Sequence, residues 1–192
     1  MVEIVRALRG TYRLARLDAT GLDDFNATIG GFWNSFLAAV IVAPGYAIVI
    51  GPGLARMPTD DALRAILAEI LAYITAWTAF PLLMIHIAER IGRDAAYIRF
   101  IVAYNWSSVI QMMVLLTAAL IGASMPVNAT VMLHVGALGL ILAYRWFIAR
   151  TALQVNGGTA MGIVGLGMLI EFMTSTAAAL VGAAPGPAGI GQ

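Results

Sequence analysis

The sequence has no cysteine, no lysine and few charged side chains of either sign. Without cysteine, disulfides, thiolate metal ligands and cysteine nucleophiles are excluded. Charged residues make up 11% of the 192 residues, whereas a soluble domain carries roughly 25%. Because 61% of the residues are hydrophobic, the chain cannot cover a surface that faces water. We therefore predict that lipid surrounds most of it.

Motifs for catalysis or nucleotide binding are also missing. The sequence contains no HExxH, GxSxG, Walker A or dinucleotide-binding pattern. Its two histidines, His86 and His134, fall at opposite ends of different predicted helices, which disfavours a metal site. No basic surface large enough for nucleic acid is indicated. We therefore expect no enzymatic activity, no cofactor, no metal and no nucleic-acid partner.

Five long apolar segments are present, and they cover residues 32–50, 63–87, 96–123, 129–153 and 159–183. Each apolar core has about 19 to 25 residues, which is enough to cross a hydrocarbon layer of about 30 Å. The sequence therefore predicts an all-α integral membrane bundle of five transmembrane helices in residues 32–183. A cytoplasmic N-terminal segment with an amphipathic helix (1–31) precedes the bundle, and a flexible tail (184–192) follows it.

Proline, glycine and threonine give further local predictions for the first two segments. Pro44 removes a backbone hydrogen bond within the first segment and predicts a kink there. The run Gly51-Pro52-Gly53 predicts the end of that helix. Thr59, which two acidic residues follow, predicts the N-cap of the next helix.

The arginines are distributed unevenly between the two ends of the predicted bundle. Nine of the eleven fall at the end that holds the N-terminus, at positions 6, 9, 13, 16, 90, 93, 99, 145 and 150. Only Arg56 and Arg64 fall at the other end, where Asp60 and Asp61 offset them. The positive-inside rule then predicts a cytoplasmic N-terminus and a C-terminus outside the cell.

Four of these arginines are spaced three or four residues apart in the N-terminal segment: Arg6, Arg9, Arg13 and Arg16. On a helix they form one stripe beside an apolar face. This pattern predicts an amphipathic helix that lies in the membrane interface, with the four arginines as contacts for lipid headgroups. A basic flank that only sets the topology explains the same pattern, and the sequence leaves this alternative open.

A candidate cluster of polar side chains lies inside the predicted membrane segments: Asn105, Ser108, Gln111 and Glu171. Glu171 is about 18 Å from the start of the fifth segment, and Gln111 lies at a similar depth in the third. Because polar groups at this depth usually face the bundle interior, we predict that the third and fifth helices pack through these four residues. They serve either as hydrogen bonds between helices, which contribute about 0.6 to 2 kcal/mol each, or as a polar path.

Short motifs resemble those of the bacterial Yip1-like family of integral membrane proteins. They are GFWNSF at residues 31–36, YNW at 104–106 and AYRWFIAR at 143–150, on a pattern of five spans after a cytoplasmic segment. The resemblance implies a five-span fold and a location in the bacterial inner membrane. The eukaryotic members carry a longer acidic and aromatic N-terminal region that this sequence lacks, so their link to membrane traffic and small GTPases is not transferred.

Two functions are compatible with these features. The first is a non-enzymatic membrane protein that organises the lipid bilayer or partner proteins, as a homo-oligomer or with another membrane protein. The alternative is a small permease or channel-like protein with a polar path at Asn105, Gln111 and Glu171. A path needs polar residues at every depth, but residues 112–123 of the third segment are apolar apart from Thr117. The sequence therefore favours the first function.

Overall fold

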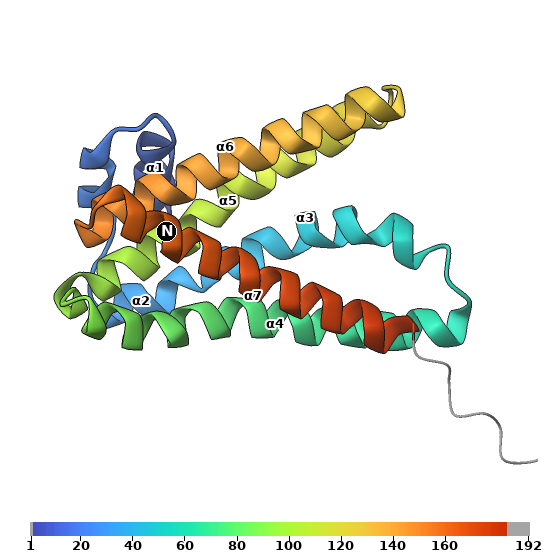
Figure 1. The fold of residues 1–192 in the computed structure, drawn as a ribbon, viewed down its shortest axis with the longest axis horizontal. Coiled ribbons are helices and arrows are strands. Elements are labelled where there is room, and N and C mark those ends of the chain that lie inside the picture. The colour runs from blue at the N-terminus through green and yellow to red at the C-terminus, as the bar shows by residue number, and fades with distance from the viewer. Residues whose placement is uncertain (1, 184–192) are drawn as a thin grey trace, which may run out of the picture.

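The computed structural model describes residues 2–183, which are helical apart from short connections (Figure 1). Their helical elements are α1 (Val2–Ala15), η1 (Ala19–Asp24), α2 (Ile29–Ser35), α3 (Leu37–Leu54), α4 (Thr59–Arg90), η2 (Asp94–Ala96), α5 (Tyr97–Gly122), α6 (Val127–Leu153) and α7 (Gly157–Ala183). η1 and η2 are short 3-10 helices.

Five stretches of the described chain are long and apolar enough to cross a membrane: Ile29–Leu54, Asp61–Arg90, Asp94–Gly122, Val127–Leu153 and Gly157–Gly182. The prediction of an all-α fold with five such helices is therefore confirmed. The predicted tail, residues 184–192, lies outside the described residues.

The first stretch differs in detail from its prediction. It consists of two helices, α2 and α3, which meet at Phe36. α3 continues through Pro44 and Pro52 to Leu54, so the predicted end at residues 51–53 is wrong. Proline is tolerated within helices that span membranes when nearby groups satisfy the freed backbone carbonyl.

The prediction of Thr59 as an N-cap is also wrong. Thr59 is the first residue of α4, and Pro58 occupies the N-cap position with φ −55° and ψ 148°. Pro58 makes no hydrogen bond from its side chain to the helix. The extended backbone of proline therefore starts this helix one residue earlier than the capping pattern indicates.

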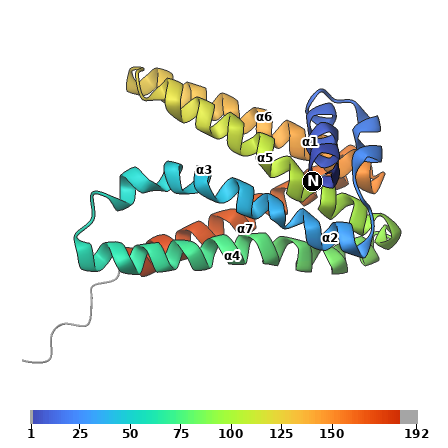
Figure 2. The same cartoon turned by 180° about the vertical axis from the view of Figure 1, so that it is seen from behind.

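The long helices form two groups that diverge from a common end (Figures 1 and 2). α5 and α6 make an antiparallel hairpin, and α7 lies along α4. α3 packs against α5, and α7 also packs against α6. With distance from α1, the α5–α6 hairpin spreads away from α3, α4 and α7 (Figure 1). α1 lies across the closed end, where the α4–α5 and α6–α7 connections are found.

The best-packed part of the molecule is the end near α1. Its largest fully buried side chains include Trp106, Phe100 and Leu14, which come from α5 and α1. Toward the other end, large apolar side chains such as Leu120 and Met132 are more than 70% exposed, at 72% and 76%. Such exposure is expected where lipid is the solvent. The two groups of helices are therefore held together at one end and separate from each other at the other end.

Small residues place α1 against this closed end. The face that α1 buries consists of Ala7, Gly10, Thr11 and Leu14. A Cβ atom on Gly10 would lie 2.7 Å from the carbonyl oxygen of Gly21, so η1 can pack this closely only against glycine. Tyr144 of α6 donates a hydrogen bond of 2.8 Å to the carbonyl oxygen of Thr11. α1 is thus fixed to the bundle by its small-residue face.

Candidate functional site

An ion pair between α6 and α7 is the central feature of the candidate site. Nη1 of Arg145 lies 2.8 Å from Oε1 of Glu171. The backbone of Arg145 lies about 12 Å before the end of α6, because Arg145 is eight positions before Leu153. Its helix neighbours Ile141 and Ile148 are buried, so the side chain leaves from the inward face of α6.

The sequence pattern groups Arg145 with the arginines at the membrane boundary and leaves it outside the predicted polar cluster. Its depth and its spacing from Ile141 and Ile148 are the signals that could have found it, since a residue three or four positions from core residues shares their face. The nearby Arg150, which is exposed, gives the segment the pattern of an interfacial belt. Arg145 is therefore the residue of the candidate site that the sequence-based prediction missed.

α5 fixes the position of the Arg145 guanidinium. Nε of Arg145 donates to Oε1 of Gln111 at 2.6 Å, and Nε2 of Gln111 donates to the hydroxyl of Ser107 at 2.8 Å. The guanidinium carbon also lies 5.7 Å from the ring centre of Tyr104, in a cation–π contact. Contacts on three sides therefore hold this side chain in one orientation.

The four residues of the predicted cluster all line one cavity, but they do not pack as predicted. α7 packs mainly against α4 and α6, and Arg145 connects Gln111 to Glu171 in place of a direct contact. Asn105 turns toward α2 and donates to the hydroxyl of Ser35 at 2.9 Å. Ser108 donates to the carbonyl oxygen of Asn105 at 2.6 Å. The four residues therefore form part of the cavity wall. The prediction that α5 and α7 pack through them is wrong, because Arg145 of α6 lies between Gln111 and Glu171.

The cavity has a volume of ≈ 500 Å³ and lies between the α5–α6 hairpin and the other three long helices. Its lining residues are Val42, Tyr46, Ala72, Tyr73, Ala76, Trp77, Pro81, Tyr104, Asn105, Ser108, Gln111, Met112, Leu115, Leu138, Ile141, Leu142, Arg145, Met168, Glu171, Phe172, Thr174 and Ser175. The side chain of Glu171 is 47% exposed, whereas that of Arg145 is 14% exposed. The carboxylate is therefore the charged group that a molecule in the cavity meets first.

An aromatic wall faces the same cavity from α3 and α4. The rings of Tyr46 and Tyr73 are 5.0 Å apart, and those of Tyr73 and Trp77 are 6.1 Å apart. The hydroxyl of Tyr46 donates to Oε2 of Glu69 at 2.6 Å, and that of Tyr73 donates to the carbonyl oxygen of Ala39 at 2.7 Å. These bonds fix the rings, so the cavity combines a small polar region with a larger aromatic and aliphatic one.

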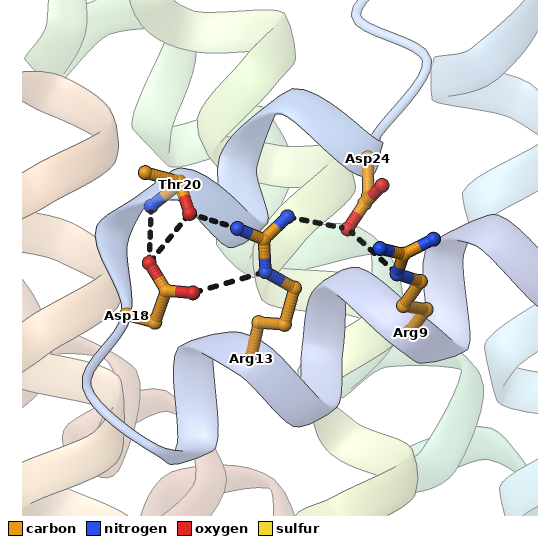
Figure 3. A network of polar contacts seen from close by, with 5 residues as sticks. All are labelled: Arg9, Arg13, Asp18, Thr20 and Asp24. Carbon is orange, nitrogen blue, oxygen red and sulfur yellow. Dashed lines mark hydrogen bonds and ion pairs between the residues drawn. The ribbon is translucent and has the colours of Figure 1, made fainter.

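The N-terminal arginines are not equivalent in the structure (Figure 3). Arg13 lies 3.0 Å from Asp18 and 3.2 Å from Asp24, and it also donates to the hydroxyl of Thr20. The hydrogen bonds from Thr20 and Arg13 hold the pKa of Asp18 below its usual value. The same carboxylates raise the pKa of Arg13. Arg13 is thus committed to contacts within the chain, while Arg9 only approaches Asp24, at 4.0 Å.

The outer face of α1 carries both charge and apolar side chains. Arg6 and Arg16 are exposed, and Arg16 lies 5.9 Å from the ring centre of Tyr12. Val5 and Tyr12 are also exposed, at 64% and 58%. Contact of this face with a membrane surface remains a prediction.

Comparison with known protein families, curated proteins and solved structures finds no match for this chain. The candidate site is therefore interpreted from its own geometry and chemistry.

Proposed function

We propose that this chain is a permease-like membrane protein that binds a small amphipathic molecule in the cavity between its two groups of helices. One observation carries the proposal: the Arg145–Glu171 pair lies on the wall of a ≈ 500 Å³ cavity and is not enclosed by the helices. A pair that only joined two helices would have no need of such a space. Sites for small molecules have volumes of about 300 to 1,000 Å³.

The distribution of polar side chains in the cavity supports binding of an amphipathic ligand and does not support ion conduction. Glu171, Arg145 and Gln111 form one polar region. Most of the remaining lining is apolar or aromatic, as at Leu115 and Leu138, and its other polar side chains, such as Ser108 and Thr174, carry no charge. An ion path requires polar groups at every depth, whereas an amphipathic molecule needs one polar contact and an apolar surface. The apolar outer half of α5 is therefore compatible with a permease-like protein that binds an amphipathic molecule.

Ligand protection of an introduced cysteine tests the proposal, and the absence of native cysteine makes the experiment direct. Ser108→Cys places a thiol on the cavity wall, and Met113→Cys places one on an exposed part of the same helix. We expect at least one member of a series of single-chain amphiphiles with ammonium, carboxylate or uncharged heads to slow maleimide modification at position 108 only. Glu171→Gln should weaken this protection. Equal effects at both positions, or none, would contradict the proposal.

A role in organising the membrane is a second proposal. The exposed face of α1 favours it, because Val5 and Tyr12 stand beside Arg6, Arg9 and Arg16. Such a face suits anionic lipid headgroups at the cytoplasmic surface of a bacterial inner membrane.

An environment-sensitive dye on Val5→Cys, in the full chain in lipid nanodiscs, tests this role. Its emission should shift to shorter wavelength in anionic lipid, and the shift should shrink when Arg6, Arg9 and Arg16 become glutamine. Changing Arg56, which lies between α3 and α4 at the other end of the bundle (Figure 1), provides the control. An emission spectrum that does not depend on lipid charge would count against membrane contact by α1.

A further inference from the structure

We propose that a second pocket, at the α1 end of the bundle, binds a phosphate group through Arg93 and Arg99. The pocket has a volume of ≈ 330 Å³. The α4–α5 connection, the first turn of α5 and the end of α6 form it, together with Ala27 from the segment before α2. This inference does not depend on the function of the central cavity.

The lining of the pocket carries positive charge and no acidic side chain, although Asp94 directly follows Arg93 in the sequence. Arg93 and Arg99 both line it, and its other lining residues are small, apolar or neutral, such as Gly92 and Gln154. Within the described residues, no ion pair joins either arginine to a carboxylate. Two guanidinium groups on one pocket favour an anion, and their planar donor forks match the oxygens of phosphate.

The structure holds the Arg99 side chain at the edge of this pocket. Its Nη2 donates to the carbonyl oxygen of Ala152, at the end of α6, at 2.8 Å. Its Nε is buried, and within the described part of the chain it has no hydrogen-bond partner. The contact with Ala152 orders the guanidinium without neutralising it, because a carbonyl group carries no net charge. The remaining charge is what a bound anion would neutralise.

A comparison with Arg13 shows why this pair of arginines stands out. Asp18 and Asp24 neutralise Arg13 at 3.0 and 3.2 Å. Arg93, in contrast, is exposed, and within the described residues its side chain makes no hydrogen bond. Most residues that line the pocket belong to the α4–α5 connection, the start of α5 and the end of α6, and Figure 1 shows these segments at the α1 end of the bundle. If the five helices span a bilayer, this is the level of the headgroups, where basic pockets between helices bind phosphate.

Phosphate can come from a phospholipid headgroup or from solution, and the test separates the two sources. The full chain is purified from a mixture of phosphatidylglycerol and phosphatidylcholine, and the retained lipids are counted by native mass spectrometry. Arg93→Gln should lower the retained ratio of phosphatidylglycerol to phosphatidylcholine about fivefold. Arg90→Gln is the control, because Arg90 is exposed, lies in the last turn of α4 and does not line the pocket.

In a second arm, inorganic phosphate is added to the protein in nanodiscs of phosphatidylcholine alone, and the thermal midpoint is followed. A rise in wild type that Arg93→Gln abolishes and Arg90→Gln retains would identify free phosphate as the ligand. Selective phosphatidylglycerol retention without this rise would identify a lipid headgroup. Arg99→Gln also removes the bond to Ala152, so Arg93→Gln decides the outcome. Equal lipid retention in wild type, Arg93→Gln and Arg90→Gln, with no effect of phosphate, would overturn the inference.

Discussion

Arg145 brings a full positive charge into the interior of the bundle, where such a charge is costly unless it is paired. Glu171 supplies the counterion at 2.8 Å, and Gln111 and Tyr104 occupy two other sides of the guanidinium. The two partners differ in environment, because the Arg145 side chain is 14% exposed and that of Glu171 is 47% exposed. Loss of the carboxylate therefore leaves the more deeply buried of the two charges alone.

Glu171→Leu should destabilise the protein by about 1 to 3 kcal/mol, because it leaves a mostly buried guanidinium without its counterion. Adding Arg145→Met to the same chain should recover part of this loss, since no unpaired charge then remains. The measurement is reversible unfolding in detergent micelles. Thr176→Leu, at an exposed position of α7, serves as the control and should change stability little. Arg145→Met alone completes the comparison: if its effect and that of Glu171→Leu simply add in the double variant, the pair does not act as a unit.

Asp18 makes the contact between α1 and η1 sensitive to acid. Its pKa is lowered in the folded chain, first by the hydrogen bond from Thr20 and then by that from Arg13. A lowered folded-state pKa contributes stability that is present above the unfolded-state value of about 4 and is lost as the pH falls through the folded-state value. The protection factors of residues 10–24, which correct exchange rates for the intrinsic effect of pH, should therefore be constant from neutral pH to about 5 and should fall below about 4. Asp18→Asn should show the faster exchange at neutral pH, and acid-independent protection in wild type would refute this assignment.

The positions of the helices were predictable from the sequence, whereas the face that each helix buries was only partly predictable. Hydropathy alone located the five membrane-capable helices. It was sufficient because a helix forms its backbone hydrogen bonds within its own segment, so its existence does not depend on distant residues. The break at Phe36 and the passage of α3 through Pro52 were not predictable, since neighbouring helices decide whether such irregularities are tolerated. In α1, apolar side chains such as Val5 and Tyr12 stay exposed, and the buried face holds Leu14 together with the small residues Ala7, Gly10 and Thr11. Close approach between backbones explains this choice better than hydrophobicity does.

The contact between Gly10 and Gly21 gives a prediction for a single methyl group. In Gly10→Ala, the new Cβ would lie 2.7 Å from the carbonyl oxygen of Gly21, and η1 would have to move. We expect a loss of about 1 to 3 kcal/mol, visible as faster hydrogen exchange in residues 2–24. Gly162→Ala is the matched control, because nothing lies within 4 Å of its added Cβ. It should be neutral or stabilise α7 by up to about 1 kcal/mol. Equal responses of the two variants would show that this close approach is not required.

At the scale of the whole molecule, the candidate site depends on the divergence of the two groups of helices. Polarity at membrane depth identified Asn105, Ser108, Gln111 and Glu171 in advance, and all four line the cavity. The space between them was not predictable, because it arises from how the α5–α6 hairpin is oriented against α3, α4 and α7. Orientation of this kind depends on contacts between distant residues, such as Arg145 with Glu171, and leaves no local pattern in the sequence.

The orientation of the whole chain in the membrane is a separate prediction. Even with Arg145 inside the bundle, eight arginines remain at the N-terminal end of the molecule and two at the other. The positive-inside rule still predicts a cytoplasmic N-terminus. A reporter that is active only in the cytoplasm should work when fused before α1 and fail when fused after residue 192. The reverse pattern would show that the arginines do not set the topology.

Accessibility of the cavity to water is the measurement that tests the proposed ligand site most directly. A charged methanethiosulfonate that cannot cross membranes is added on either side of proteoliposomes that contain Ser108→Cys or Met113→Cys. The thiolate attacks the reagent and displaces its sulfinate group, and the thiolate forms readily in a wet site and poorly in lipid. Position 108 on the cavity wall should therefore react about tenfold faster than position 113. Equally slow reaction at both positions would mean that the helices close around the Arg145–Glu171 pair and that no ligand site exists there.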